Sequence, residues 1–273
     1  MRANTRSEDL RGLGLAVASS AAFALSGPFA RALIDTGWTP LSAVAIRTWG
    51  AFAVLLLPAL LALRGRWSLL RDDVWMIAGF GLLGVAGAQL CFFNAVARMP
   101  VALALLIEYM APLAIIVWLW AVRGQRPTRL TTAGAALSMA GLAAVLGVLG
   151  GVSVSAAGVI WASGAMIGAA GYFLISAHDR SGLPPIVLAT GGLGAGAVLL
   201  TAAGVTGLQR FGASAADAEI AGAVVPWWAP AAVLIVVTAA LAYALGVTAA
   251  RMLGARVMAF VALTEVLFAA LFA

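Results

Sequence analysis

Two carboxylates lie within long apolar stretches of this sequence, and either could bind a cation. Glu108 lies in the stretch 101–122 and Glu265 in the stretch 256–273. If these stretches cross a membrane, each charge costs about 2.5–3.5 kcal/mol on insertion scales, which makes it a functional candidate by default. Such a group could bind a cationic or amino group, or carry a proton. A structural carboxylate that bonds to a neighbouring helix is the alternative for both residues.

Tyr109 and Pro112 would add polar groups around Glu108. A proline inside a helix deprives the carbonyl four residues earlier of its hydrogen bond, and that carbonyl belongs to Glu108 itself. The hydroxyl-bearing Tyr109 is the next residue along the chain. Discontinuous helices of this sort often line the cavities of transporters. A proline kink that serves packing alone is the alternative, because such kinks are common in membrane helices.

Three further polar residues lie within apolar stretches. Arg47 could form a structural or gating ion pair with an intramembrane carboxylate, bind an anionic group of a substrate, or extend to the membrane surface. The ion pair is the favoured interpretation. Gln89 and Asn94 are more often hydrogen-bond partners between helices than ligands of a substrate.

Aromatic residues complete the set of candidates. Tyr172 and Tyr243 occupy otherwise apolar segments, where each hydroxyl needs a partner, and both could line a cavity. Trp161 could line a pocket too, although tryptophan near a helix end usually lies at the membrane interface. The single histidine has no second ligand at a useful spacing, so no metal site is predicted. No cofactor or ATP-binding signature is predicted either.

The composition determines which kind of molecule must position these residues. Of 273 residues, 64% are hydrophobic and 10% are charged, whereas a soluble domain is about half apolar and a quarter charged. The net charge is +6, but the basic residues are sixteen arginines scattered between apolar runs. This pattern indicates orientation in a membrane and gives no reason to expect a nucleic-acid partner. The sequence therefore predicts an all-α transmembrane protein whose partners are the lipid bilayer and a small-molecule substrate.

Breaks between the apolar runs predict the membrane spans, each about 20 residues long. Nine spans are expected near residues 12–34, 40–63, 74–97, 101–122, 130–150, 156–177, 184–207, 228–250 and 256–273. With a cytoplasmic N-terminus, twelve arginines fall on the inside and three on the outside, as the positive-inside rule requires. We therefore expect a multi-pass protein of a bacterial-type cytoplasmic membrane, with its N-terminus in the cytoplasm.

A weak internal repeat indicates two halves. A shift of 145 residues aligns TGWTP (36–40) with SGLPP (181–185), and a shift of 153 aligns the two ARM triplets at 97–99 and 250–252. The halves would be residues 1–150 with spans 1–5 and residues 151–273 with spans 6–9. An odd number of spans inserts the second half upside down, which is a common signature of secondary transporters. Because the last span has no polar flank, we expect that the rest of it and a tenth span are missing.

The residues resemble those of a known family. The chain is similar to the ten-helix EamA-type branch of the drug/metabolite transporter superfamily, which includes exporters of amino acids and other metabolites. The resemblance rests on the order and spacing of four segments: TPLSAVAIR (39–47), NAVARMP (94–100), LIEYMAPL (106–113) and LTEVL (263–267). In one departure, Val266 occupies the position after Glu265 where the family often has proline.

The expected function follows from the resemblance together with the intramembrane carboxylates. The resemblance implies a secondary transporter of the cytoplasmic membrane that moves small metabolites such as amino acids, in the direction of export. Alternating access about a site between the halves is the expected mechanism. A non-transporting accessory or scaffold subunit is the alternative, and a membrane-embedded enzyme is a more distant one. Nothing in the residues indicates an oligomeric state.

Overall fold

The computed structural model describes residues 2–124, 126–129, 132–134, 136–137, 140–141, 155–178 and 182–272. Seven helical stretches of this part of the chain are long and apolar enough to cross a membrane. They are Glu8–Asp35, Pro40–Leu63, Val74–Val96, Val101–Val122, Ala156–Ser176, Pro185–Val205 and Trp228–Leu253. Each coincides with a predicted span to within a few residues. Much of the predicted span 130–150 lies outside the described residues, so the count of nine stays a prediction.

Several of these stretches contain more than one element. The first comprises α1 (Arg2–Ala24) and α2 (Ser26–Asp35), and the second is α3 (Pro40–Leu63). The third comprises α5 (Val74–Gly79), the π-helical segment η1 (Phe80–Gly87) and α6 (Ala88–Val96). The next are α7 (Val101–Glu108) with α8 (Ala111–Arg123), then α10 (Ala156–Ser176) and α11 (Pro185–Val205). The last comprises α12 (Trp228–Ile235), the π-helical segment η2 (Val236–Leu241) and α13 (Ala242–Leu253).

Five shorter elements also occur in the described part of the chain. Helix α4 (Ser68–Asp72) lies between α3 and α5. Strands β1 (Ala218–Ile220) and β2 (Ala223–Val225) form an antiparallel hairpin before α12. After α13, the predicted span 256–273 is two short helices, α14 (Ala255–Val261) and α15 (Thr264–Phe272).

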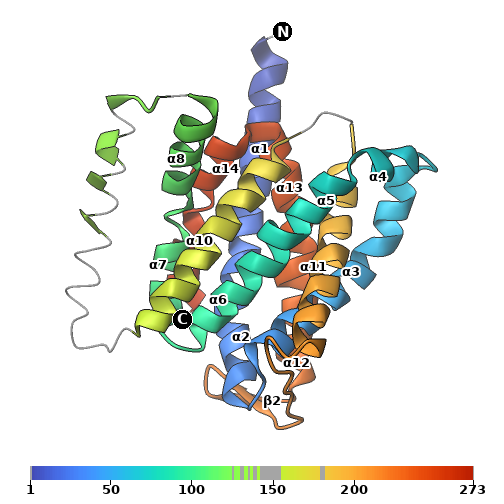
Figure 1. Ribbon diagram of the computed structural model, residues 1–273, viewed down its shortest axis with the longest axis vertical. Helices are drawn as coiled ribbons and strands as arrows, with labels where there is room; N and C mark the ends of the chain where they lie inside the picture. The colour runs from blue at the N-terminus through green and yellow to red at the C-terminus, as the bar shows by residue number, and fades with distance from the viewer. Residues whose placement is uncertain are drawn as a thin grey trace.

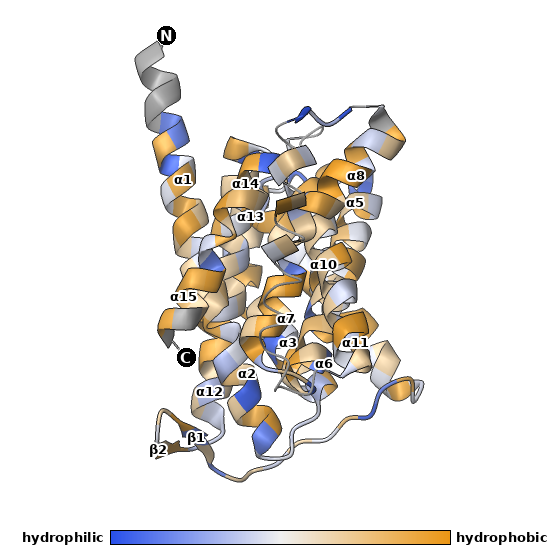
Figure 2. Cartoon of the chain, turned by 90° about the vertical axis from the view of Figure 1, so that its left-hand side faces the viewer, coloured by the Kyte–Doolittle hydropathy of each residue, from blue (hydrophilic) through white to orange (hydrophobic). Residues whose placement is uncertain are grey.

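The long helices pack side by side in one bundle, and their outer surface is apolar (Figures 1 and 2). Leu57 and Leu61 on α3 are 65% and 67% exposed, and Ile160 on α10 is 72% exposed. In water such a surface would favour aggregation, whereas in a bilayer it contacts lipid. The prediction of an all-α membrane protein is confirmed.

Contacts between the two predicted halves run through the whole bundle. Helix α3 packs on α11, α6 packs on α10, and α1 packs on α13. Each of these pairs joins an element of residues 1–150 to an element of residues 151–273. The inverted relation of the halves stays a prediction, but their helices are interleaved.

Two helices of the bundle are broken, and each break lies next to one of the two intramembrane carboxylates. α7 ends at Glu108 and α8 begins at Ala111, directly before Pro112, so the discontinuity predicted from that proline is confirmed. The backbone N–H of Met110 bonds to the carbonyl of Ile107 at 3.0 Å, which forms a tight turn at the break. A second break separates α14 from α15 just before Glu265, although no proline occurs there.

Glycines allow the helices of the two halves to approach closely. A Cβ added at Gly168 of α10 would lie 2.6 Å from the Cα of Ala88 on α6. One added at Gly81 of η1 would lie 2.6 Å from the Cβ of Ala195 and 2.9 Å from the carbonyl oxygen of Gly192, both on α11. Small residues at such crossings are the usual way to pack helices in a membrane. Gly168 and Gly81 therefore lie on packing faces of their helices.

The contact of Gly168 with the α6 backbone predicts that Gly168→Ala destabilises the protein. The added methyl group would meet main-chain atoms of Ala88, which cannot move aside, and overpacking of this kind costs about 1–3 kcal/mol. We expect a lower thermal unfolding midpoint in detergent. Gly14→Ala is the matched control, because a Cβ there has open space around it. An unchanged midpoint for Gly168→Ala would contradict this close packing.

Candidate functional site

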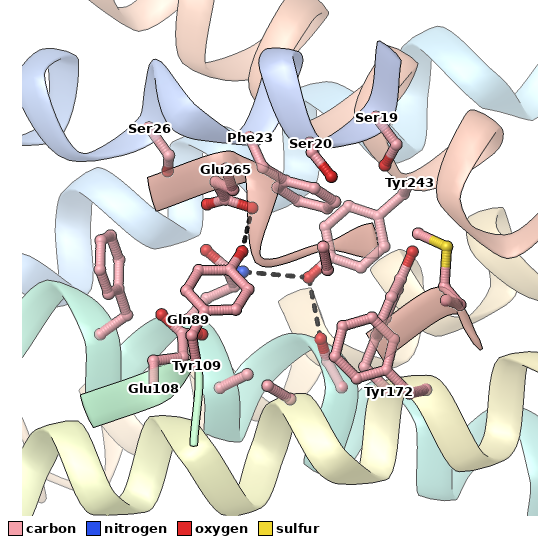
Figure 3. Close-up of a pocket in the computed structure, with 17 residues that line it drawn as sticks. Ser19, Ser20, Phe23, Ser26, Gln89, Glu108, Tyr109, Tyr172, Tyr243 and Glu265 are labelled. Atoms are coloured by element: carbon pink, nitrogen blue, oxygen red, sulfur yellow. Dashed lines mark hydrogen bonds between the residues drawn. The ribbon is translucent and has the colours of Figure 1, made fainter. Parts of the chain in front are cut away.

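A cavity of about 60 Å³ lies inside the bundle, where the two broken helices meet the first, third, fifth and last long stretches (Figure 3). It holds both carboxylates that the sequence singled out, Glu108 at the end of α7 and Glu265 at the start of α15. The residues lining it come from both predicted halves. They are Ser19, Ser20, Phe23, Ser26, Gly84, Ala88, Gln89, Phe92, Glu108, Tyr109, Ala169, Tyr172, Phe173, Tyr243, Met258, Ala262 and Glu265.

A hydrogen bond joins the two helix breaks across the cavity. The hydroxyl of Tyr109, in the turn between α7 and α8, donates to the carboxylate of Glu265 (Figure 3). Both residues are buried, with 7% of each exposed. Glu265 also starts α15, where its backbone N–H bonds to the carbonyl of Ala262 at 2.9 Å. Tyr109 lies at one helix break and Glu265 at the other, so the hydrogen bond between them joins the two predicted halves.

Glu108 differs from Glu265 in having no such partner. Among the described residues, no hydrogen bond or ion pair holds its carboxylate. It lines the cavity and is only partly buried by the surrounding side chains. A carboxylate without a hydrogen-bond partner is available to a cationic ligand, which makes Glu108 the freer of the two acidic groups.

Arg47 is fully buried beside this cavity and does not line it. One terminal nitrogen donates to the side-chain carbonyl of Gln89 and the other to the backbone carbonyl of Thr238 in η2. Its guanidinium carbon lies 6.0 Å from the ring centre of Phe23 and 5.7 Å from that of Phe93, within the range of cation–π attraction. The side chain does not extend to the membrane surface. The favoured ion pair is not observed either, because no carboxylate of the described residues lies within 4.0 Å of it.

Gln89 extends this set of bonds to the other π-helical segment. Its amide nitrogen donates to the hydroxyl of Tyr243 at 3.3 Å, and that hydroxyl donates to the carbonyl of Gly84 in η1 at 2.9 Å. A π-helical segment departs from the regular bonding of the α-helix and often occurs at functional sites. Each such segment here offers a carbonyl to a side chain of the other half. We call this run the polar chain: Thr238, Arg47, Gln89, Tyr243 and Gly84.

Two hydroxyls at the cavity have no hydrogen-bond partner among the described residues. They belong to Ser26 at the start of α2 and to Tyr172 of α10, and both are buried. Tyr172 packs in a cluster of rings, with its ring centre 5.6 Å from that of Tyr243 and 6.3 Å from that of Phe23. Buried hydroxyls in proteins are normally bonded, so an unbonded pair beside one cavity indicates room for a ligand or water.

Four of the predicted site residues do not line this cavity, and Arg47, described above, is one of them. Pro112 instead acts through the helix break that precedes it. Asn94 donates to the carbonyl of Leu90 at 2.9 Å and accepts from Arg98 at 2.9 Å, so it does not connect two helices as expected. Trp161 lies beneath the same Arg98, with its ring centre 5.9 Å from the guanidinium carbon. These residues form a separate cluster at the C-terminal end of α6.

The structure adds residues that the sequence did not single out. Helix α1 contributes Ser19, Ser20 and Phe23 to the cavity, and α14 contributes Met258. A serine pair inside an apolar span was a usable signal, but Ser20 bonds to the carbonyl of Ala16 in its own helix, as many membrane serines do. The role of the Thr238 carbonyl could not be predicted from the sequence, because it is a main-chain group that the local helix geometry makes available.

No three His, Cys, Asp or Glu side chains of the described part of the chain come together as metal ligands. The groups at the cavity instead form a candidate binding site for a small molecule. Two carboxylates, several rings and unbonded hydroxyls surround a small enclosed space within the membrane-spanning bundle. Such a site can hold a small polar or charged molecule away from lipid.

Comparisons with known proteins agree with this fold. A solved structure titled "Crystal structure of protein" is similar to the chain at a TM-score of 0.64 and 21% identity, over 97% of this chain and 86% of that one. No curated protein matches the sequence. The model of the EamA-like transporter family matches residues 10–147, which is half of the chain. The resemblance noted in the sequence is thereby confirmed, and the chain is a multi-pass membrane transporter that belongs to the EamA-like transporter family.

Proposed function

We propose that this chain is a secondary transporter of the cytoplasmic membrane that exports small metabolites, with amino acids as the class that the family resemblance implies. The observation that carries the proposal is the bond between Tyr109 and Glu265 at the cavity. It joins two discontinuous helices, one from each predicted half, at a site inside the bundle. Broken helices that meet at such a site are typical of secondary transporters.

Alternating access requires contacts between the halves that can be exchanged. Residues 1–150 and 151–273 are joined at the cavity by the Tyr109–Glu265 bond and beside it by the polar chain. Net hydrogen-bond energies are about 0.5–1.5 kcal/mol each, so a few such bonds can break and re-form during a cycle. We propose that the halves rock about the cavity as these bonds exchange.

The cavity is small for a metabolite, which supports a state of the proposed cycle in which the site is contracted. A water molecule needs about 10–15 Å³ of such space, so a cavity of about 60 Å³ holds only a few waters. A metabolite would enter only after the surrounding helices move apart. The bond between Tyr109 and Glu265 closes the space between the two breaks, so it is a natural contact to open first.

The proposed orientation has the N-terminus in the cytoplasm. The connection from α3 to α4 carries Arg64 and Arg66 at the same end of the bundle as the N-terminus (Figure 1). The start of α14, with Arg256, lies at that end too. Arginine-rich connections of membrane proteins face the cytoplasm.

Loss of either cavity carboxylate should abolish most transport. In proteoliposomes tested with radiolabelled amino acids and other metabolites, with and without a pH gradient, we expect saturable flux from the wild-type chain. Glu108→Gln and Glu265→Gln should each lower it by about tenfold or more, which is at least 1.4 kcal/mol of binding or coupling. Glu219→Gln, in the exposed hairpin strand β1, is the matched control and should leave flux unchanged.

The same assay separates transport from the alternative of an accessory subunit. Folded, monodisperse protein that carries no member of the panel would favour the accessory subunit. Flux that survives both substitutions would show that the cavity is not the transport site.

A reversible cross-link should stop the cycle. The Cβ of Thr39, at the start of α3, lies 4.0 Å from the position of a Cβ at residue 212, which is within the range of about 3.5–4.5 Å found in disulfides. Thr39→Cys with Gly212→Cys, in a Cys91→Ser background, joins the two predicted halves at the end opposite the N-terminus. We expect flux to fall on oxidation and to return on reduction.

Each single cysteine variant is the control for this cross-link and should transport normally under both conditions. Full flux through a quantitatively cross-linked protein would show that the halves do not separate at this end.

A further inference from the structure

We infer that the cavity selects its substrate through a positively charged amine and provides no site for a carboxylate. This inference rests on the proposed transport function and narrows the cargo of the same site. It favours organic amines over the amino acids that the family resemblance implies. Three features of the cavity support it: its charge, its rings and its unbonded hydroxyls.

The charged groups that line the cavity are both acidic. Glu108 and Glu265 lie on its wall, and none of the described lining residues is basic. Arg47 is near the cavity but does not line it. Its two terminal nitrogens donate hydrogen bonds to the side chain of Gln89 and to the carbonyl of Thr238. A cation in the cavity would therefore contact two carboxylates, whereas an anion would contact the same two carboxylates and no basic side chain of the described lining.

The rings around the cavity suit a cation for a second reason. Six of the seventeen lining residues are aromatic: Phe23, Phe92, Tyr109, Tyr172, Phe173 and Tyr243. The face of an aromatic ring carries partial negative charge and attracts ammonium groups, and cages of such rings are a common way to recognise amines. The apolar parts of the same rings would pack against the carbon skeleton of the amine.

The unbonded hydroxyls provide places for the N–H groups of an amine. Ser26 is 4% exposed and Tyr172 is 6% exposed, and neither hydroxyl has a partner among the described residues. Both residues line the cavity together with the carboxylates, as Figure 3 shows. An ammonium group has three N–H donors and no acceptor. Two carboxylate oxygens and a hydroxyl oxygen could accept all three.

An amino acid would fit this site less well than the amine left when its carboxylate is removed. The amino group would have the same acceptors in both molecules. The carboxylate of the amino acid would have to be desolvated beside Glu108 and Glu265, and burial of a charge without a partner is strongly unfavourable. The difference between the two molecules is thus a direct measure of what the cavity recognises.

Matched pairs of compounds test this inference in proteoliposomes that contain the full chain. The pairs are phenylalanine with phenethylamine and alanine with ethylamine, and each pair differs by one carboxylate. We measure saturable uptake of the radiolabelled compounds and the ability of each unlabelled partner to compete. Passive leakage of the amines is subtracted with empty liposomes. We expect the amine of at least one pair to be carried, with about tenfold or greater preference over its amino acid.

The outcomes separate this inference from the proposed function. Equal or better transport of the amino acids would overturn the inference and leave the transporter in place, and so would transport of other metabolites with no transport of these amines. No saturable flux of any compound, from folded protein, would overturn the proposed function as well.

Variants locate the recognition of the amine at the cavity. Glu108→Gln and Glu265→Gln should weaken competition by the amines by about tenfold or more, because each removes a negative charge while keeping the shape of the side chain. Glu219→Gln should leave it unchanged. The thermal unfolding transition of each purified variant, measured without amine, checks that the variants are folded. Competition by amines that is unaffected in both glutamate variants would overturn the inference.

Discussion

The hydrocarbon core of a bilayer supplies no water, so most polar groups inside this protein are bonded to the protein itself. Arg47 shows the consequence most clearly. It is fully buried, and its two terminal nitrogens are bonded to Gln89 and to the carbonyl of Thr238. The second of these partners lies in the other predicted half. The need to satisfy one buried cation thus helps to hold residues 1–150 against residues 151–273.

The irregular helices follow from the same requirement. In a continuous α-helix most carbonyls already accept a bond from their own helix, so they have less capacity left for a neighbour. The π-helical segments η1 and η2 expose carbonyls to Tyr243 and Arg47, and the breaks after α7 and α14 place Tyr109 and Glu265 opposite each other. Each departure from regular geometry therefore has a side chain of the other half as its partner. The site is built where the helices are least regular.

Much of the fold could be predicted from the sequence, because long apolar runs leave few alternatives in a membrane. The break at Pro112 was also predictable, since proline cannot bond to the preceding turn. The break before Glu265 was not, because no proline marks it. The two carboxylates were found by their position in apolar runs, and both line the cavity. The partners of Arg47 could not be found in this way, because one of them is a main-chain carbonyl whose availability depends on tertiary packing.

The connection between α11 and α12 adds hydrogen bonds between the two predicted halves at one end of the bundle. It lies against the start of α3 at one end only, where the backbone N–H of Thr39 bonds to the carbonyl of Gly212 at 2.9 Å and that of Gly212 bonds to Ser42 at 2.9 Å. The indole of Trp38 adds a bond to the carbonyl of Ser214 at 2.8 Å.

At about 1 kcal/mol each, three such bonds shift an equilibrium by roughly a hundredfold. If the halves exchange access as proposed, these bonds would weight the empty transporter toward molecules shut at this end. Such a bias would set where an unloaded molecule waits for its cargo, without any energy input.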